Sequence, residues 1–189
     1  MNPVKVRNIT IGEGTPKICV PIVGVTKEEI LEAGKNICTI GADVIEWRVD
    51  WYENVFDFDQ VEETAKELRN VIGETALLFT FRTAKEGGEK AIEPDVYVAL
   101  NERAAKSRQV DLVDVEAFTG ETAVKQIIET AHATGVKVVA SNHDFHKTPA
   151  QEEIVSRLCK MQELGADIPK IAVMPVSYSH LTRPTKRGV

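Results

Sequence analysis

The 189-residue sequence lacks several features that would place it in a large class of proteins. No apolar run approaches the roughly 20 residues of a membrane-spanning helix, and the first ten residues lack the apolar stretch of a secretory signal. Positive charge is also scarce, because 23 Lys and Arg face 29 Asp and Glu. A general nucleic-acid-binding surface needs a basic stripe, so we expect a cytoplasmic protein that binds neither a membrane nor nucleic acid.

Cysteine is equally scarce, with three isolated residues and no CxxC pair. An odd number of scattered thiols does not indicate a disulfide framework or a cysteine-based zinc site. Cys19 and Cys38 lie within apolar patterns, so we expect both thiols to be buried and reduced.

What the sequence does contain is a regular alternation of strand-like and helix-like segments. Short apolar runs rich in Val, Ile and Ala occur at residues 18–23, 44–49, 77–81, 112–115, 136–140 and 168–174. Segments with a helical spacing of apolar residues lie between them, at residues 28–40, 61–72, 96–108, 123–133 and 152–164. Strands that alternate with helices in this way predict an α/β protein with a parallel sheet.

Two architectures fit this alternation, an open doubly wound sheet and part of a (β/α)8 TIM barrel. The turn after the first run, VGVTKEE, has neither the GxGxxG loop nor the P-loop lysine that open sheets usually carry. Charged residues lie late in several strands, which is where barrel enzymes place the groups around their mouth. We therefore predict one incomplete (β/α) barrel domain over residues 1–175, with about six β/α units and a strand or hairpin at residues 4–12.

The motif VIEWRVD places Glu46, Arg48 and Asp50 on one face of a strand, because side chains alternate. One hypothesis is an internal Glu46–Arg48 ion pair that only stabilises the barrel. The other hypothesis is a group that binds the hydroxyls or the carboxylate of a small polar substrate.

Further charged residues lie at the ends of the following strands. Arg82 suits a planar anion, and Glu86, which two glycines follow, could orient a histidine. Either residue alone is also typical of an ordinary surface charge. Asp114 and Glu116 share a strand face, and we expect them to supply supporting electrostatics.

His143 ends its strand in the motif SNHDFH, a position where a structural histidine is also common. Together with His146 it allows a metal-binding hypothesis. No third or fourth ligand clusters nearby in the sequence, so we expect no metal.

Lys170 lies at the start of an apolar run that we expect to be buried on both faces of the sheet. A buried lysine is either paired with a carboxylate, such as Glu46 or Glu116, or held neutral as a nucleophile. A neutral amine can attack a ketone to form a Schiff base. His143 could then remove a proton α to the imine and protonate the leaving hydroxyl.

Several stretches together resemble type I 3-dehydroquinate dehydratase, the Schiff-base lyase of the shikimate pathway. They are GEG with PKI near the start, EWRVD, LLFTFRTAKEGGE, SNHDFHKTP and EEIVSRLCKMQELGADIPKIAVMP. The resemblance implies a (β/α)8 barrel that is commonly a homodimer and needs no cofactor or metal. It also implies a small-molecule substrate, 3-dehydroquinate, and a role in aromatic amino acid and chorismate biosynthesis.

The same resemblance implies roles for particular residues. Lys170 would form the imine, His143 would be the general acid and base, and Glu86 would orient His143. The substrate-binding positions of the family match Glu46, Arg48 and Arg82. Some members carry a serine ligand where this chain has Pro21.

After Pro175 the sequence departs from the family, which continues through two more strand–helix units that carry a clamping arginine, a serine and a glutamine. Residues 176–189 instead read VSYSHLTRPTKRGV, without an amphipathic period. We expect an irregular tail and a truncated or altered ending. An incomplete barrel with two unpaired edges predicts low stability and weak turnover. The alternatives to the dehydratase are therefore an impaired or inactive fragment of that enzyme and an aldolase-like Schiff-base lyase.

Overall fold

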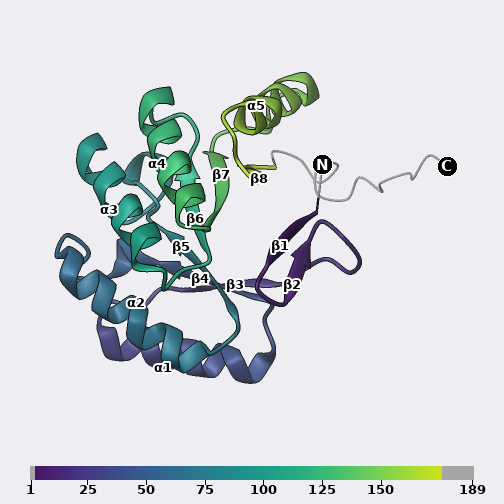
Figure 1. Ribbon diagram of the computed structural model, residues 1–189. Coiled ribbons are helices and arrows are strands. Elements are labelled where there is room, and N and C mark those ends of the chain that lie inside the picture. The colour runs from purple at the N-terminus through teal and green to yellow at the C-terminus, as the bar shows by residue number, and fades with distance from the viewer. Residues whose placement is uncertain (1–2, 176–189) are drawn as a thin grey trace.

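The computed structural model describes residues 3–175. A six-stranded parallel sheet runs through it in the order β3-β4-β5-β6-β7-β8, so each strand pairs with the next one along the chain. This order is that of a barrel wall, since a doubly wound sheet reverses its order at a switch point. The sheet curls into an arc with helices along its outside (Figure 1), and the predicted incomplete barrel is confirmed.

The secondary-structure elements follow the predicted segments closely. The wall consists of β3 (Cys19–Ile22), β4 (Val44–Arg48), β5 (Ala76–Thr80), β6 (Leu112–Glu116), β7 (Lys137–Asp144) and β8 (Ile168–Val173). The helices are α1 (Lys27–Ile40), α2 (Phe58–Ile72), α3 (Pro94–Ser107), α4 (Glu121–Ala133) and α5 (Gln151–Glu163). Short 3-10 helices, η1 (Val49–Trp51) and η2 (Ala84–Glu86), follow β4 and β5. The predicted hairpin forms from β1 (Val4–Val6) and β2 (Ile9–Ile11), which are antiparallel.

The first helix shows how local sequence sets these boundaries. Thr26 accepts the backbone N–H of Glu29, and the Glu29 carboxylate accepts the backbone N–H of Thr26. This capping box satisfies donors that a helix start otherwise leaves unpaired. α1 ends at Ile40 and is followed by the capping residue Gly41, whose φ of 81° lies in the left-handed region that glycine favours.

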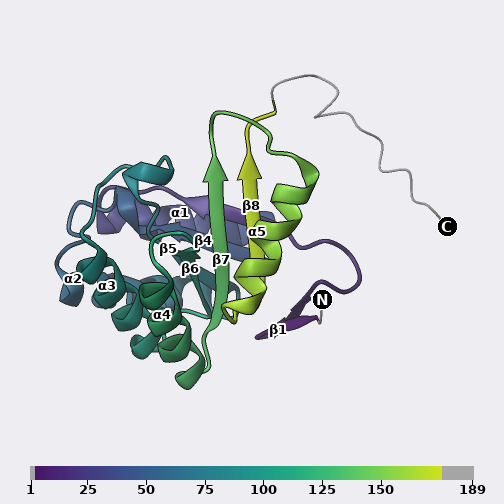
Figure 2. The same cartoon turned by 90° about the horizontal axis from the view of Figure 1, so that it is seen from above.

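Apolar side chains are divided between the two faces of the sheet. The helices cover the outer face and form the main core with residues such as Ile45, Trp47, Phe79 and Val113. Figure 2 shows α5 beside β7 and β8, at the other end of the sheet from α1. A second cluster lies on the inner face, where Val6 of the hairpin packs on residues in the first half of the wall strands. These residues are Val44, Ala76, Leu78, Leu112 and Val139. The later part of the inner face is left to polar side chains.

Three aspartates set the register where strands begin. Each directly precedes a strand, and its carboxylate accepts a backbone N–H near the start of the strand before. The pairs are Asp43 with Ile18, Asp111 with Leu77 and Asp167 with Val138, at 2.8, 2.8 and 2.9 Å. Each carboxylate thus joins two adjacent strands of the wall.

Two predictions about burial are wrong. Cys19 and Cys38 are exposed rather than buried, and all six residues of β8 are half-buried rather than covered on both faces. β3 and β8 are the end strands of the described sheet, each with one neighbour, so the wall leaves part of their surface open. The predicted irregular tail, residues 176–189, lies outside the described residues. None of the described helices has the length and hydropathy to cross a bilayer.

The contacts of Asp111 predict a large effect on stability. Its carboxylate accepts from Arg7 Nε and Arg69 Nη2, both at 2.6 Å, besides the Leu77 N–H. We expect Asp111→Ala to lower the free energy of unfolding by about 2–4 kcal/mol, because charge-assisted bonds are lost and the largely buried Arg69 loses its carboxylate. Chemical denaturation measures this change.

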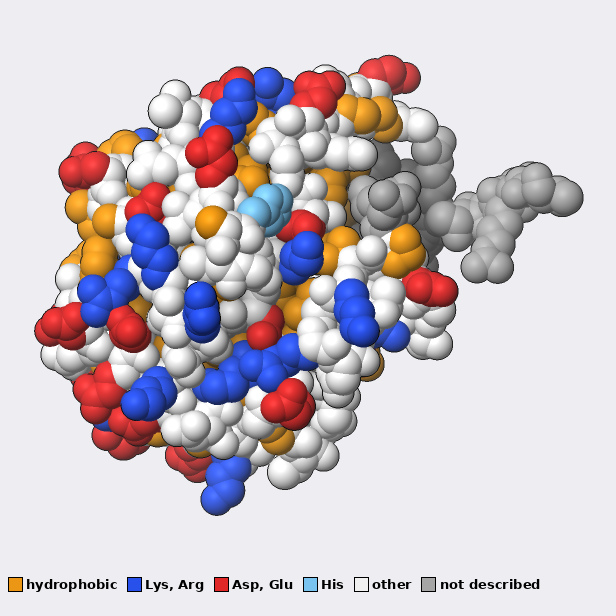
Figure 3. Space-filling model, viewed as in Figure 1, with side chains coloured by type: hydrophobic (Ala, Val, Ile, Leu, Met, Phe, Trp, Pro, Cys, Tyr) orange, Lys and Arg blue, Asp and Glu red, His pale blue; other side chains and the backbone are white. Residues whose placement is uncertain are grey.

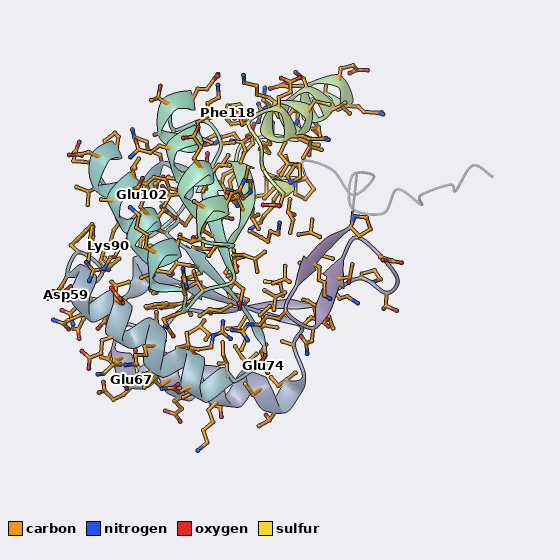
Figure 4. All side chains as sticks on the ribbon, viewed as in Figure 1. Asp59, Glu67, Glu74, Lys90, Glu102 and Phe118 are labelled. Atoms are coloured by element: carbon orange, nitrogen blue, oxygen red, sulfur yellow. The ribbon has the colours of Figure 1, made fainter. Side chains whose placement is uncertain are left out.

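The matched control is Glu74→Ala. Glu74 also pairs with Arg7, at 2.8 Å, but its side chain is 83% exposed, and Figure 4 labels it just past the end of α2. Its loss should cost less than about 1 kcal/mol. Equal losses for the two variants would contradict a register role for Asp111.

Lys and Arg side chains gather with acidic neighbours on the face that Figure 3 shows.

Candidate active site

Polar side chains line the inner face of the barrel beyond the apolar cluster. Residues at alternate positions share a face, so the inward positions continue from Val44 to Glu46, from Leu112 to Asp114 and from Ile168 to Lys170. The polar residues at inward positions of these strands are Glu46 and Arg48 on β4, Thr80 on β5, Asp114 and Glu116 on β6, Ser141 and His143 on β7, and Lys170 on β8. They lie between the middle of each strand and its carboxyl end, and barrel enzymes carry their chemistry at the carboxyl ends.

Arg82, directly beyond β5, is the most connected of the buried charges. Its side chain is 4% exposed and donates to Asp114 Oδ1 at 2.7 Å and to Glu116 Oε1 and Ser141 Oγ at 3.0 Å each. Burial alone would lower the pKa of Arg82, but the negative charges of Asp114 and Glu116 raise it above its ordinary value. The guanidinium is therefore a fixed cation. The predicted direct contact of Arg82 with substrate stays a prediction.

Arg48 takes a different partner from the one in the ion-pair hypothesis. Its Nε and Nη2 donate to the two carboxylate oxygens of Asp50, both at 2.8 Å. Asp50 is fully buried in η1, just past the strand, and it also accepts the N–H of Arg82. Glu46 instead accepts from Thr80 Oγ1 at 2.8 Å. The Glu46–Arg48 ion pair is thus replaced by two separate contacts.

Glu86 and His143 lie together although 57 residues separate them. Glu86 Oε2 is 2.8 Å from His143 Nδ1 and accepts the backbone N–H of His143 at 3.0 Å. A carboxylate can only accept, so we assign the hydrogen of the neutral ring to Nδ1. Nε2 is then the ring nitrogen that can take a proton.

The turn that carries Glu86 requires glycine. Gly87 has a φ of 82°, and a Cβ there would lie 2.5 Å from the ring of Phe145. A Cβ on Gly88 would lie 1.8 Å from the carbonyl oxygen of Arg82. The backbone can therefore fold back over Arg82 and bring Glu86 to β7 only with these two glycines.

Lys170 faces a carboxylate that the sequence did not indicate as its partner. Its side chain is 38% exposed, and its Nζ forms an ion pair with Asp114 Oδ2 at 3.7 Å, whereas neither Glu46 nor Glu116 is its ion-pair partner among the described residues. Asp114 Oδ2 is buried and has no hydrogen-bond partner among the described residues. Lys170 pairs with Ser141 in the β7–β8 register, so His143 is two residues further along the adjacent strand. Strand geometry puts the two Cα atoms roughly 8 Å apart.

Two cavities open near these groups. One of about 610 Å³ is lined by Lys170, Glu46 and Cys19, among others. The other, of about 390 Å³, is lined by residues that include Glu86, Glu116 and His143. His146 is exposed, and residues 3–175 contain no group of three or more His, Cys, Asp or Glu side chains placed to hold a metal.

The sequence did not indicate several residues that hold this site. Thr80 and Ser141 share the inward face with Glu46 and Lys170, so the strand alternation could have identified them. Asn142, which donates to Glu86 Oε1 at 3.2 Å, had no such signal.

The fold and the position of these groups define a (β/α) barrel enzyme, and comparisons with known proteins specify which kind. The sequence profile described as type I 3-dehydroquinase matches residues 18–183. The 3-dehydroquinate dehydratase of Listeria monocytogenes serotype 4a is 58% identical over 177 residues, which are 94% of this chain and 70% of the relative. That of Clostridioides difficile is 55% identical over 172 residues, 91% of this chain and 68% of the relative.

A solved structure agrees with these relatives. The type I 3-dehydroquinate dehydratase of Clostridium difficile, crystallised with covalently modified comenic acid, is 54% identical, with a TM-score of 0.92 over 93% of this chain and 70% of that one. This chain belongs to the type I 3-dehydroquinase family. An aldolase called QR15, at 18% identity and a TM-score of 0.62, covers 85% of this chain and 70% of its own and shares the fold alone.

The Gly88 contact predicts that this turn tolerates no side chain. We expect Gly88→Ala to displace the backbone, to cost about 3 kcal/mol or more of stability, and to separate Glu86 from His143. Denaturation measures the first effect, and the ¹⁵N shifts of the His143 ring report the second.

Gly41→Ala is the control, because Gly41 has open space around it and lies at the end of α1. It should cost about 1–2 kcal/mol through its left-handed backbone and leave the His143 shifts unchanged. Unchanged His143 shifts in Gly88→Ala would contradict the role assigned to the turn.

Proposed function

We propose that this protein is a 3-dehydroquinate dehydratase, which removes water from 3-dehydroquinate to give 3-dehydroshikimate through a Schiff base on Lys170. Membership of the family and the identity to named dehydratases support the activity. The observation that carries the residue assignment is that Lys170 and His143 lie on adjacent strands and the same inner face, and that Glu86 on η2 contacts His143. A family member has been crystallised with covalently modified comenic acid, which agrees with covalent chemistry.

The first half of the reaction takes place at Lys170. Asp114 Oδ2, 3.7 Å away, accepts a proton from the ammonium group and leaves a neutral amine. The nitrogen lone pair forms a bond to the ketone carbon, the C=O π electrons move to the oxygen, and this oxygen takes back the proton that Asp114 holds. The carbinolamine nitrogen passes its extra proton to the hydroxyl, which leaves as water, and the resulting iminium has the Asp114 carboxylate as its counter-ion.

The second half takes place at His143. Its Nε2 removes a proton α to the iminium, and the electrons of that C–H bond form an enamine. The enamine expels the β-hydroxyl, which leaves as water with the proton that His143 returns. Glu86 stabilises the imidazolium between these two transfers, as an acidic partner does for a catalytic histidine. Hydrolysis of the conjugated imine releases the product and the free amine.

Glu46, Arg48 and Arg82 are proposed to bind the hydroxyl and carboxylate groups of the substrate. Arg48 suits this role, since Asp50 fixes its guanidinium plane while 22% of the side chain remains exposed. No cofactor or metal enters these steps. The homodimer that the family implies stays a prediction, which sedimentation analysis can test.

Trapping with borohydride tests the proposed function. With 3-dehydroquinate and borohydride, we expect a reduced adduct on the peptide that contains Lys170, detected by mass spectrometry, and dehydroshikimate formation detected by ultraviolet absorbance. Lys170→Met should abolish the adduct and lower turnover by orders of magnitude, because no other group forms the imine.

Lys160→Met is the control, since Lys160 lies on α5 and pairs with Glu121. It should leave both readouts unchanged. An adduct on another residue, or an active Lys170→Met protein, would overturn the proposal. An aldolase would instead trap an aldol substrate, and an inactive fragment would give no adduct and no stabilisation by 3-dehydroquinate.

A further inference from the structure

We infer that Asn142 and Arg157 are positioning residues for His143 and act on it through Glu86. This inference rests on the proposed function, because it assigns His143 the proton transfers. Neither residue touches the reacting atoms in the proposed steps. Both are connected to the imidazole by a continuous series of hydrogen bonds that begins on α5.

The series has a defined direction. Arg157 Nη1 donates to Asn142 Oδ1 at 2.8 Å. A guanidinium can only donate, so the amide oxygen of Asn142 faces Arg157 and its NH₂ group faces Glu86. Asn142 Nδ2 donates to Glu86 Oε1 at 3.2 Å, while Oε2 of the same carboxylate takes the two hydrogen bonds from His143. Each oxygen of Glu86 therefore has its own donor.

Glu86 has a competing partner that makes this arrangement necessary. Arg82 Nη1 is 3.9 Å from Glu86 Oε2, just beyond hydrogen-bond distance. A carboxylate free to rotate or shift would gain a charge-assisted bond by moving toward that buried cation. The bond from Asn142 to Oε1 holds Glu86 against this movement, so Oε2 stays at His143 Nδ1 and Nε2 stays directed away from Glu86.

Arg157 links this carboxylate to the outer layer of the barrel. It also contacts Glu153 one turn earlier on α5, and its Nη1 is 4.0 Å from Asp144 Oδ2. Met161 is the one buried residue of α5, so α5 packs on the wall through few apolar contacts. A purely structural role would use Arg157 only to hold α5. A positioning role requires that its loss changes the protonation behaviour of His143.

Single-turnover kinetics separate the two roles. In Asn142→Ala, adduct formation on Lys170, trapped with borohydride, should stay within about twofold of wild type, while dehydroshikimate release slows by about tenfold or more. Arg157→Met should also slow dehydroshikimate release more than adduct formation, but by a smaller factor. Arg157→Lys should restore part of the release rate, because an ammonium group can still donate to Asn142. Arg103→Met, which removes an exposed arginine on α3, is the control.

The pH profile gives a second readout. In Asn142→Ala, Glu86 can move toward Arg82, so His143 loses the carboxylate that favours its imidazolium form. The acidic limb of the elimination rate should therefore move to lower pH. An unchanged profile together with parallel losses in both single-turnover rates would overturn the positioning role.

The ring signals of His143 keep the inference testable without turnover. In wild type the ¹⁵N shifts should report a hydrogen on Nδ1, and in Asn142→Ala the tautomer with hydrogen on Nε2 should increase. No change in the tautomer would overturn the positioning role. Failure of wild type to form an adduct or product would instead overturn the proposed function.

Discussion

The contact of buried Arg82 with Asp114 and Glu116 is the constraint on which the site depends. Asp114 is fully buried and Glu116 is 1% exposed, and burial raises the pKa of Glu116 despite the neighbouring cation and the Thr83 N–H. Taking two carboxylates out of water without a charge partner costs several kcal/mol per ion. Arg82 offsets this cost, and through Ser141 it reaches a third strand, so one side chain joins β5, β6 and β7.

The positions of both reactive groups follow from this ion network. Arg82 takes one oxygen of Asp114 and leaves the other, Oδ2, facing Lys170. Glu116 also accepts the N–H and the hydroxyl of Thr83, both at 2.8 Å, which anchors the start of the turn toward Glu86. The amine on β8 and the imidazole on β7 are thus set by the same buried cation. The lower inner face can stay apolar because the β1–β2 hairpin covers it.

Local order could be predicted from the sequence, but side-chain partners were harder to predict. The spacing of apolar residues predicted the six strands and five helices, and the charged residues late in the strands favoured a barrel over an open sheet. Both predictions succeeded because each signal is contained in a stretch of a few residues. Period does not tell whether a strand has neighbours on both sides, which is why Cys19 and β8 were expected to be buried. The alternation of side chains also predicted that the β4 strand continues to Asp50. In the structure the chain enters η1 after Arg48, and Asp50 is the ion-pair partner of Arg48.

Contacts between segments that lie far apart in the chain are the hardest to predict from a single sequence. Glu86 and His143 could be paired through the family resemblance, but their spacing in the chain predicts no contact. Glu46 and Glu116 were the partners considered if Lys170 formed an ion pair. Its amine faces Asp114 instead, because the register of β6, β7 and β8 decides which inward residues lie opposite one another. The links from Arg157 and Asn142 depend on where α5 packs, which no motif reports.

The most direct test of this account is the pH dependence of unfolding for Arg82→Met beside wild type. Burial raises the pKa of Glu116, and loss of the Arg82 charge raises it further, so the folded variant binds more protons than the unfolded chain and gains stability as pH falls. The variant should be about 3–5 kcal/mol less stable at neutral pH, with the deficit shrinking toward pH 5 as Glu116 protonates. A deficit that is absent, or equally large at both pH values, would contradict the claim that Arg82 holds the site together.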